Sequence, residues 1–162
     1  MTKIGLLSDT HAYWDDKFAH YFADCDEIWH AGDIGSEEVL HRLDTIKPVR
    51  AVHGNIDDYQ LRHLCPTILR FEVEQVSVLM THIGGYPGKY TPEIRQELYR
   101  STPRLFVCGH SHILKVMYDP KLQMLCLNPG AAGKFGFHQV RTLLRFAIDG
   151  QEIKNMEVIE LA

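Results

Sequence analysis

The feature that most constrains the fold is a series of short polar motifs, each placed directly after an apolar run. The motifs are Asp9-Thr10-His11, Gly32-Asp33, Gly54-Asn55, Thr81-His82 and Gly109-His110-Ser111-His112. Their leading acidic, amide or imidazole side chains stand 24, 22, 27 and 28 residues apart, about the length of one strand–helix unit. Because the carboxyl ends of parallel strands meet at one edge of a sheet, this spacing predicts that the motifs converge there.

The N-terminal part of the chain alternates between apolar runs and amphipathic segments. The apolar runs predict buried strands over 3–8, 27–31 and 48–52. The segments between them show helical spacing of apolar residues over 15–24 and 36–45. Strand, helix, strand, helix, strand is typical of a parallel sheet, so this part is predicted to form a βαβαβ unit.

The middle of the chain contains a hairpin pattern followed by a helix pattern. Residues 67–81 are apolar on both sides of Glu74-Gln75, which predicts two strands joined by a tight turn. The segment 91–100 predicts a helix, in which we expect the Thr91 side chain to cap the first turn and Pro92 to occupy the first position.

The last third of the chain loses its helical periodicity. Leu105 to Cys108 predicts one more buried strand, and from residue 113 onward the turn formers Asp119-Pro120 and Asp149-Gly150 predict antiparallel strands. We interpret the shift near residue 113 as a change of sheet within a single domain of residues 1–162. The predicted fold class is therefore α/β with a parallel N-terminal part and an antiparallel C-terminal part.

Composition limits the classes of partner. The chain has 162 residues with 45% hydrophobic content, enough for a sizeable core. Its net charge of −4 gives no global attraction for nucleic acid or anionic membrane, so an anionic ligand would have to be held locally, for example by bound cations. The apolar run at the start is shorter than we expect of a signal peptide or a membrane span, and the four cysteines form no CxxC pair. We therefore expect a cytoplasmic protein with free thiols.

The motif side chains form a coherent set of metal ligands. Carboxylate, imidazole and amide oxygen suit manganese, iron, zinc or magnesium, and the motifs contain no thiolate. Asp33 is the key residue, because one carboxylate can bridge two cations at the roughly 3.5–4 Å separation of two-metal hydrolases. His110 and His112 are two residues apart and can therefore serve different ions. The series predicts a two-metal site for phosphoester hydrolysis.

The motif order resembles the calcineurin-like metallophosphoesterase superfamily, and the small size with Ser8-Asp9-Thr10-His11 is similar to its YfcE-like branch. The resemblance covers nearly the whole chain and includes the turn Asn128-Pro129-Gly130. It implies a two-sheet sandwich flanked by helices and two divalent ions, with Mn²⁺ expected and Fe, Zn, Ni or Mg as alternatives. Carried over by motif, one ion would be held by Asp9, His11, Asp33 and His112, and the other by Asp33, Asn55, His82 and His110.

The resemblance also implies a mechanism. A hydroxide bridging the two ions would attack phosphorus in line, with Asp33, Asn55 and His110 as the catalytic residues and Asn55 also contacting substrate. Many relatives carry histidine directly after Gly-Asn, where it can protonate the leaving group, and this chain has Ile56 instead. The change predicts a preference for diesters with good leaving groups.

Two neighbouring residues are candidates for the missing proton donor. These are His53 and Asp57, and His53 is also a candidate substrate contact. The remaining histidines outside the motifs are expected to be structural or solvated, namely His20, His30, His41, His63 and His138.

Two alternatives to the phosphodiesterase remain. One is a protein-binding scaffold that keeps the fold without catalysis, like the phosphoesterase-fold subunit of the retromer complex, and the other is a phosphomonoesterase or nucleotidase. The expected ligand is a small phosphoester, with neither membrane nor nucleic acid as a partner. Apolar edge strands are compatible with a homodimer.

Overall fold

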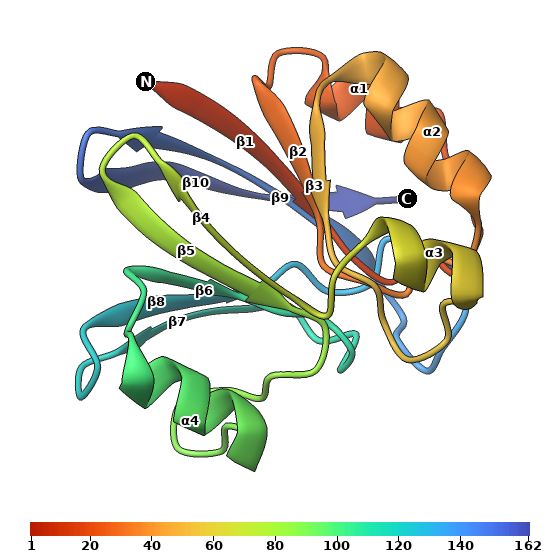
Figure 1. Ribbon diagram of the computed structural model, residues 1–162. Coiled ribbons are helices and arrows are strands. Elements are labelled where there is room, and N and C mark those ends of the chain that lie inside the picture. The colour runs from red at the N-terminus through yellow and green to blue at the C-terminus, as the bar shows by residue number, and fades with distance from the viewer.

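The computed structural model describes all 162 residues and consists of two five-stranded sheets with helices on their outer sides (Figure 1). The first sheet has the order β10-β9-β1-β2-β3 and the second β4-β5-β6-β8-β7. The strands of the first sheet are β1 (Thr2–Leu7), β2 (Glu27–His30), β3 (Val49–Ala51), β9 (Arg141–Asp149) and β10 (Glu152–Leu161). Those of the second sheet are β4 (Ile68–Val73), β5 (Val76–Thr81), β6 (Leu105–Val107), β7 (Lys115–Asp119) and β8 (Met124–Asn128).

The predicted βαβαβ unit is confirmed. β1 pairs in parallel with β2, and β2 pairs in parallel with β3. The connections contain α1 (Lys17–Phe22) and α2 (Glu37–Ile46), whose apolar faces bury Phe18, Phe22 and Leu43 in a core beneath the first sheet. Helix α2 begins where the Ser36 hydroxyl accepts a hydrogen bond from the Glu38 amide, 3.1 Å away.

The hairpin and the following helix also lie where the pattern placed them. β4 and β5 pair from Ile68 with Thr81 to Val73 with Val76, with the turn at Glu74-Gln75. Helix α4 (Pro92–Arg100) starts with proline as its first residue. The predicted Thr91 side-chain cap is wrong, because the threonine side chain makes no cap hydrogen bond and only its carbonyl accepts from the Arg95 amide.

The expected change of sheet at residue 113 is wrong in its position. The chain leaves the first sheet after β3 and returns to it at β9, so β4 to β8 all belong to the second sheet. The C-terminal strands do pair antiparallel as β7 with β8 and β9 with β10, but β8 also pairs in parallel with β6. Apolar periodicity reports which face of a strand is buried, and it carries no information about which sheet receives the strand.

A second core fills the space between the two sheets. It contains β1 and β2 side chains such as Ile4 and Trp29 from one sheet and Met80 and Val107 from the other, all fully buried. Helix α3 (Tyr59–Leu64) was not predicted, because it buries only Leu61 and so shows no apolar face in the sequence. Its N-terminus is capped by the Asp58 carboxylate. None of the four helices is long and apolar enough to cross a bilayer.

Candidate metal centre

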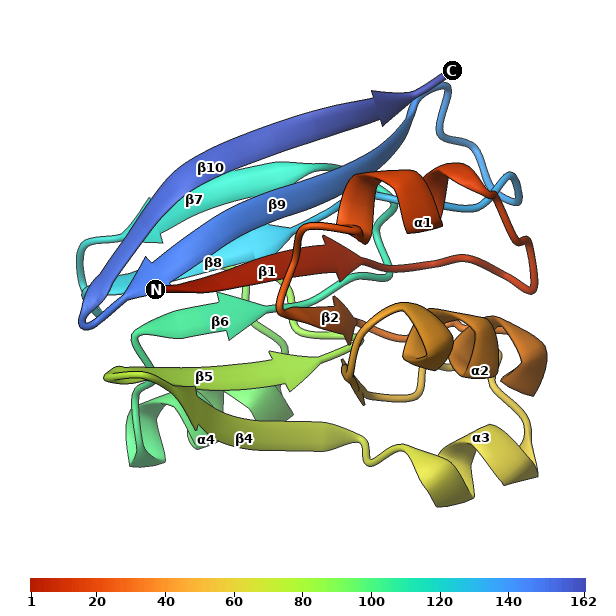
Figure 2. The ribbon, with the colours of Figure 1, turned by 90° about the horizontal axis from the view of Figure 1, so that it is seen from above.

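The predicted ligands follow the carboxyl ends of strands from both sheets. Figure 2 shows β1, β2, β5 and β6 running in the same direction, so that the loops after them lie at one end of the sandwich. Asp9 and His11 follow β1, and Asp33 follows β2. From the second sheet, His82 follows β5 directly and the segment 110–112 follows β6. The structure therefore brings together motifs that lie up to about a hundred residues apart.

The first cluster consists of Asp9, His11 and His112, whose candidate ligand atoms all lie within 4.8 Å of one another. The Nε2 atom of His112 is 3.2 Å from Asp9 Oδ1, and that of His11 is 3.8 Å from the same oxygen. The other oxygen of Asp9 accepts hydrogen bonds from the Ser8 hydroxyl and from the His110 amide. One carboxylate oxygen is thus fixed by the protein, while Oδ1 faces these two imidazoles and also lies 3.8 Å from His82 Nε2.

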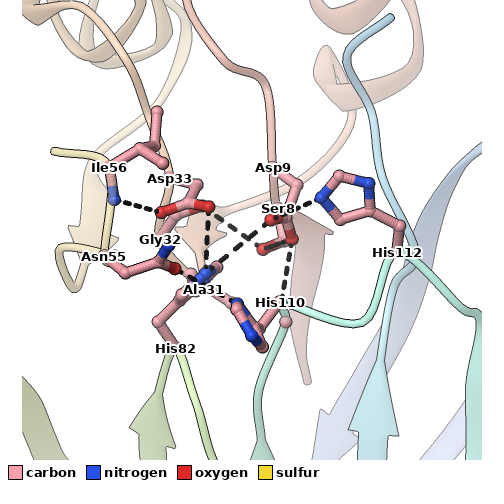
Figure 3. A network of polar contacts seen from close by, with 12 residues as sticks. Ser8, Asp9, Ala31, Gly32, Asp33, Asn55, Ile56, His82, His110 and His112 are labelled. Atoms are coloured by element: carbon pink, nitrogen blue, oxygen red, sulfur yellow. Dashed lines mark hydrogen bonds and ion pairs between the residues drawn. The ribbon is translucent and has the colours of Figure 1, made fainter. Parts of the chain in front are cut away.

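The second cluster consists of Asp33, His82 and His110. His82 Nδ1 donates to the Ala31 carbonyl at 2.7 Å, which fixes the ring and directs Nε2 at Asp33 Oδ2, 3.2 Å away. The amide oxygen of Asn55 lies 3.1 Å from His110 Nδ1, so the predicted amide ligand also reaches this cluster (Figure 3). Asn55 and His110 are exposed, whereas Asp33 and His82 are buried.

Asp33 lies between the two clusters. Its Oδ2 atom is 3.3 Å from His11 Nε2 of the first cluster and 3.2 Å from His82 Nε2 of the second. Its Oδ1 atom accepts a hydrogen bond from the Ile56 amide. Position 54 in the adjacent loop must be glycine, because a Cβ there would collide with the carboxylate and the backbone nitrogen of Asp33. A single carboxylate oxygen therefore faces imidazoles of both clusters, the arrangement expected of a bridging ligand.

The residues present fit divalent cations. Asp9 Oδ1, His11 Nε2 and His82 Nε2 are buried polar atoms that have no hydrogen-bond partner in the protein. Buried polar atoms in folded proteins are nearly always paired, so three such atoms within the two neighbouring clusters indicate missing electrostatic partners. Imidazole and carboxylate donors in this proportion suit a first-row transition metal or magnesium.

The charge distribution supports the same interpretation. Burial opposes ionisation of Asp9, but His11 and His112 outweigh it and lower the pKa of the carboxyl far below its usual range. Burial likewise opposes charge on Asp33, and His82 more than compensates and lowers its pKa. Both aspartates are therefore carboxylates at neutral pH and can act as ligands without losing a proton.

Asp57 braces the loops that carry Asp33 and Asn55. Its buried carboxylate accepts hydrogen bonds from the amides of Gly54, Ile34 and Gly35 at 2.8, 3.2 and 2.8 Å. It therefore joins the loop after β2 to the loop after β3. Both oxygens of Asp57 are engaged by backbone amides, and its candidacy as a proton donor stays a prediction.

His53 lies beside the centre and not within it. Its Nδ1 atom contacts the Cys65 carbonyl at 2.8 Å, and the ring lines a neighbouring cavity of about 540 Å³ that also borders Asn55 and His82. Ile56, at the position where relatives carry histidine, has a side chain that is 45% exposed at the mouth of the centre. Neither position offers a proton donor inside the clusters.

Two histidines outside the motifs contact the site, although no motif or spacing distinguished them from the other histidines. His138 Nδ1 lies 3.2 Å from Nδ1 of the ligand candidate His112, although it is 26 residues away along the chain. His30 is fully buried and contacts the Thr10 hydroxyl and the Gly32 amide, both in ligand-bearing loops. Both were expected to be structural or solvated, and only the three-dimensional contact distinguishes them from the other non-motif histidines.

Comparisons with known proteins find relatives of this chain in sequence and in fold. A probable metallophosphoesterase of Methanothermobacter thermautotrophicus is 32% identical over 138 residues, covering 79% of this chain and 76% of that protein. A structure described as a novel archaeal phosphodiesterase has a TM-score of 0.78 at 20% identity, covering 98% of this chain and 99% of its own. Vps29 from Entamoeba histolytica, complexed with Zn²⁺, has a TM-score of 0.76 at 15% identity and 98% coverage of both chains.

The family profile gives the widest sequence match. Residues 2–151 match the profile of the calcineurin-like phosphoesterase superfamily domain. That range contains all the residues of both clusters together with Asn55. The chain therefore belongs to the calcineurin-like phosphoesterase superfamily.

Proposed function

We propose that the protein is a two-metal phosphodiesterase. The observation that carries the proposal is the position of Asp33, whose Oδ2 atom lies 3.2–3.3 Å from an imidazole of each cluster. Paired cations sharing a carboxylate are the common device of enzymes that cleave phosphate esters. The likeness of the fold to a protein described as an archaeal phosphodiesterase supports the choice of reaction.

The ligand sets follow from the two clusters. Asp9, His11 and His112 would hold one ion, with Asp33 shared. The second ion would be held by Asp33, His82, His110 and Asn55. When bound, two divalent ions supply Lewis-acid stabilisation of phosphoryl oxygens and a water of lowered pKa, and we propose Mn²⁺ as the resident metal with Zn²⁺, Fe²⁺, Ni²⁺ or Mg²⁺ as substitutes.

The residues themselves determine how a substrate is placed. Asn55 and His110 are the exposed members of the site, so a phosphoryl group approaching from solvent meets their side chains first. The buried carboxylates stay fixed by Ser8, Ile56 and backbone amides while that happens. Rigid positioning of this kind is what phosphoryl transfer requires of the protein.

The surroundings of the centre favour diesters over monoesters. The cavity at the centre, about 470 Å³ in volume, has no lysine or arginine in its lining. The phosphoryl group of a diester carries a single negative charge. That of a monoester near neutral pH carries more negative charge, so its binding benefits from additional cationic side chains. With Ile56 at the mouth of the centre, at the position where many relatives carry a histidine, we expect good leaving groups to be cleaved fastest.

The test combines metal analysis with turnover. Wild-type protein reconstituted with Mn²⁺ should bind two ions per chain and cleave bis(4-nitrophenyl) phosphate faster than 4-nitrophenyl phosphate. Asp33→Ala should lose at least one ion and lower kcat/KM by about 10³-fold or more, because the shared ligand is gone. Asp44→Ala, an exposed position on α2, is the matched control and should retain both ions.

Three outcomes would contradict the proposal. An Asp33→Ala variant with two ions and near wild-type turnover would remove the shared-ligand argument. Faster cleavage of the monoester would favour a phosphomonoesterase. Two bound ions with no cleavage of either ester by the wild type would favour a scaffold like Vps29.

A further inference from the structure

The loop between β8 and β9 presents two exposed aromatic rings at the metal centre. Phe135 is 70% exposed and Phe137 is fully exposed, although both line the cavity that contains His11 and His112. Two more apolar side chains border the same cavity, Ile56 and Ile113, at 45% and 57% exposure. Large apolar side chains that are exposed together at one site are typical of a surface that binds a ligand or another protein.

The loop is anchored to the candidate ligands at several points. The Phe135 ring stacks on the His11 ring with centroids 5.0 Å apart and planes inclined by 25°. His138 contacts His112 through the two Nδ1 atoms, and its Nε2 donates to the Gly133 carbonyl at 2.8 Å. The Gly133 amide in turn donates to the Asp9 carbonyl. The aromatic rings are therefore placed relative to the metal ligands by specific contacts on both sides.

Gly136, between the two phenylalanines, shows how closely the loop approaches the ring of His112. Its φ is +131°, and a Cβ at this position would collide with the ring of His112. Only glycine allows the backbone to pass against that imidazole. Phe135 and Phe137 are thus carried on the two sides of a backbone segment that touches a candidate ligand.

The residues that line the cavity indicate which kind of ligand would fit it. Its polar part consists of imidazoles, Asp33, Asn55 and Ser111, and it has no lysine or arginine for a second anionic group. Its apolar part consists of two phenyl rings and two isoleucines. A ligand that matches both parts has one anionic phosphoryl group and a flat apolar substituent close to it. Aromatic side chains bind such substituents by stacking.

We propose that Phe135 and Phe137 form an aromatic subsite, which stacks on an aryl or nucleobase substituent of a phosphodiester held at the metal centre. This inference rests on the proposed function and specifies its substrate class. A face of Phe135 is free for this purpose, since stacking on His11 leaves 70% of the residue exposed.

The test compares two diester analogues that differ only in the substituent. Methyl phenylphosphonate and methyl methylphosphonate are both monoanions and keep a phosphorus–carbon bond to the group in question. Isothermal titration calorimetry of the Mn²⁺-loaded protein should give a Kd for the phenyl compound about tenfold lower than for the methyl compound. The double variant Phe135→Ala/Phe137→Ala should reduce this ratio towards one, whereas Tyr99→Ala, an exposed tyrosine on α4, should retain it.

Turnover provides a second measurement and separates this inference from the proposed function. Phenyl 4-nitrophenyl phosphate and methyl 4-nitrophenyl phosphate share a leaving group, so the ratio of their kcat/KM values reports the retained substituent. We expect a ratio of about ten in the wild type and a clear decrease in the double variant. Hydrolysis of both esters at equal kcat/KM, with equal Kd values for the two phosphonates, would overturn the aromatic subsite and leave the phosphodiesterase standing. Failure to hydrolyse either ester with two ions bound would overturn both.

Discussion

At the scale of single residues, the backbone at the centre is unusual. Five candidate ligands have φ values between +46° and +71°, the left-handed region that non-glycine residues rarely occupy: Asp9, His11, Asp33, His110 and His112. Each such residue costs of order 1–3 kcal/mol and persists only where its surroundings fix it. Strain of this kind at one site, together with unpaired buried nitrogen and oxygen atoms, is expected where the ligand geometry matters more than folding stability.

His30 predicts how the metal-free protein responds to acid. Burial lowers the pKa of its imidazole to about 4, and the neutral ring accepts from the Gly32 amide while contacting the Thr10 hydroxyl. The unfolded chain takes up this proton near pH 6.5, so the free energy of unfolding should fall as the pH drops from 6.5 towards 4, by up to about 1.4 kcal/mol per pH unit.

The ligand candidates His82 and His112 act at higher pH. The pKa values of His82 and His112 are raised, because Asp33 and Asp9 lie beside them, so their contribution is fully present below pH 6.5 and is lost only above it. Urea unfolding in EDTA at pH 5, 5.8 and 6.5 checks the prediction. His30→Gln should flatten the slope and the exposed His41→Gln should not; an unchanged slope in His30→Gln would show that His30 does not carry the effect.

At the scale of elements, strand order in the chain predicted most of the site and only part of the fold. Each motif followed an apolar run, and parallel pairing of β1 with β2 and of β5 with β6 then places the motif loops at one edge. The assignment of β4 to β8 to the second sheet could not be read from periodicity, because it depends on packing between distant segments. The contact of His138 with His112 could not be predicted for the same reason, because it depends on where the β8–β9 loop packs.

Asp57 holds two ligand-bearing loops together through hydrogen bonds from three backbone amides. Asp57→Ala would leave three backbone amides without an acceptor and separate the loop after β2 from the loop after β3, so we expect a loss of about 3 kcal/mol or more in the free energy of unfolding. Asp58→Ala, one residue further, removes only the cap of α3 and should cost about 1 kcal/mol. Urea denaturation of the metal-free variants measures both.

The same pair of variants decides between the two roles of Asp57. A brace predicts that Asp57→Ala loses stability and also metal affinity, because Asp33 and Asn55 are carried by the loops it joins. A proton donor predicts unchanged stability and a selective loss of turnover on diesters with poor leaving groups. Unchanged stability in Asp57→Ala would therefore contradict the structural role assigned above.

At the scale of the whole molecule, the metal centre joins the two sheets. The first cluster takes Asp9 and His11 from the first sheet and His112 from the second, and the second cluster takes Asp33 from the first and His82 from the second. Besides the apolar core between the sheets, each ion would therefore be a cross-link between them at the loop edge. Loss of the ions leaves buried carboxylates and imidazoles facing one another without a partner.

This arrangement predicts that metal stabilises the entire fold cooperatively. With free Mn²⁺ at about 100 times its Kd, mass action adds about 2.7 kcal/mol for one site. For a chain of this size that corresponds to a rise in Tm of roughly 5–10 °C over protein in EDTA. Differential scanning calorimetry should show one shifted transition, since both sheets are tied to the centre, and Asp33→Ala should show a much smaller shift than Asp44→Ala. Two bound ions with identical Tm values in Mn²⁺ and in EDTA would mean that the ions bind the folded and the unfolded chain equally well, which would contradict a centre assembled by folding.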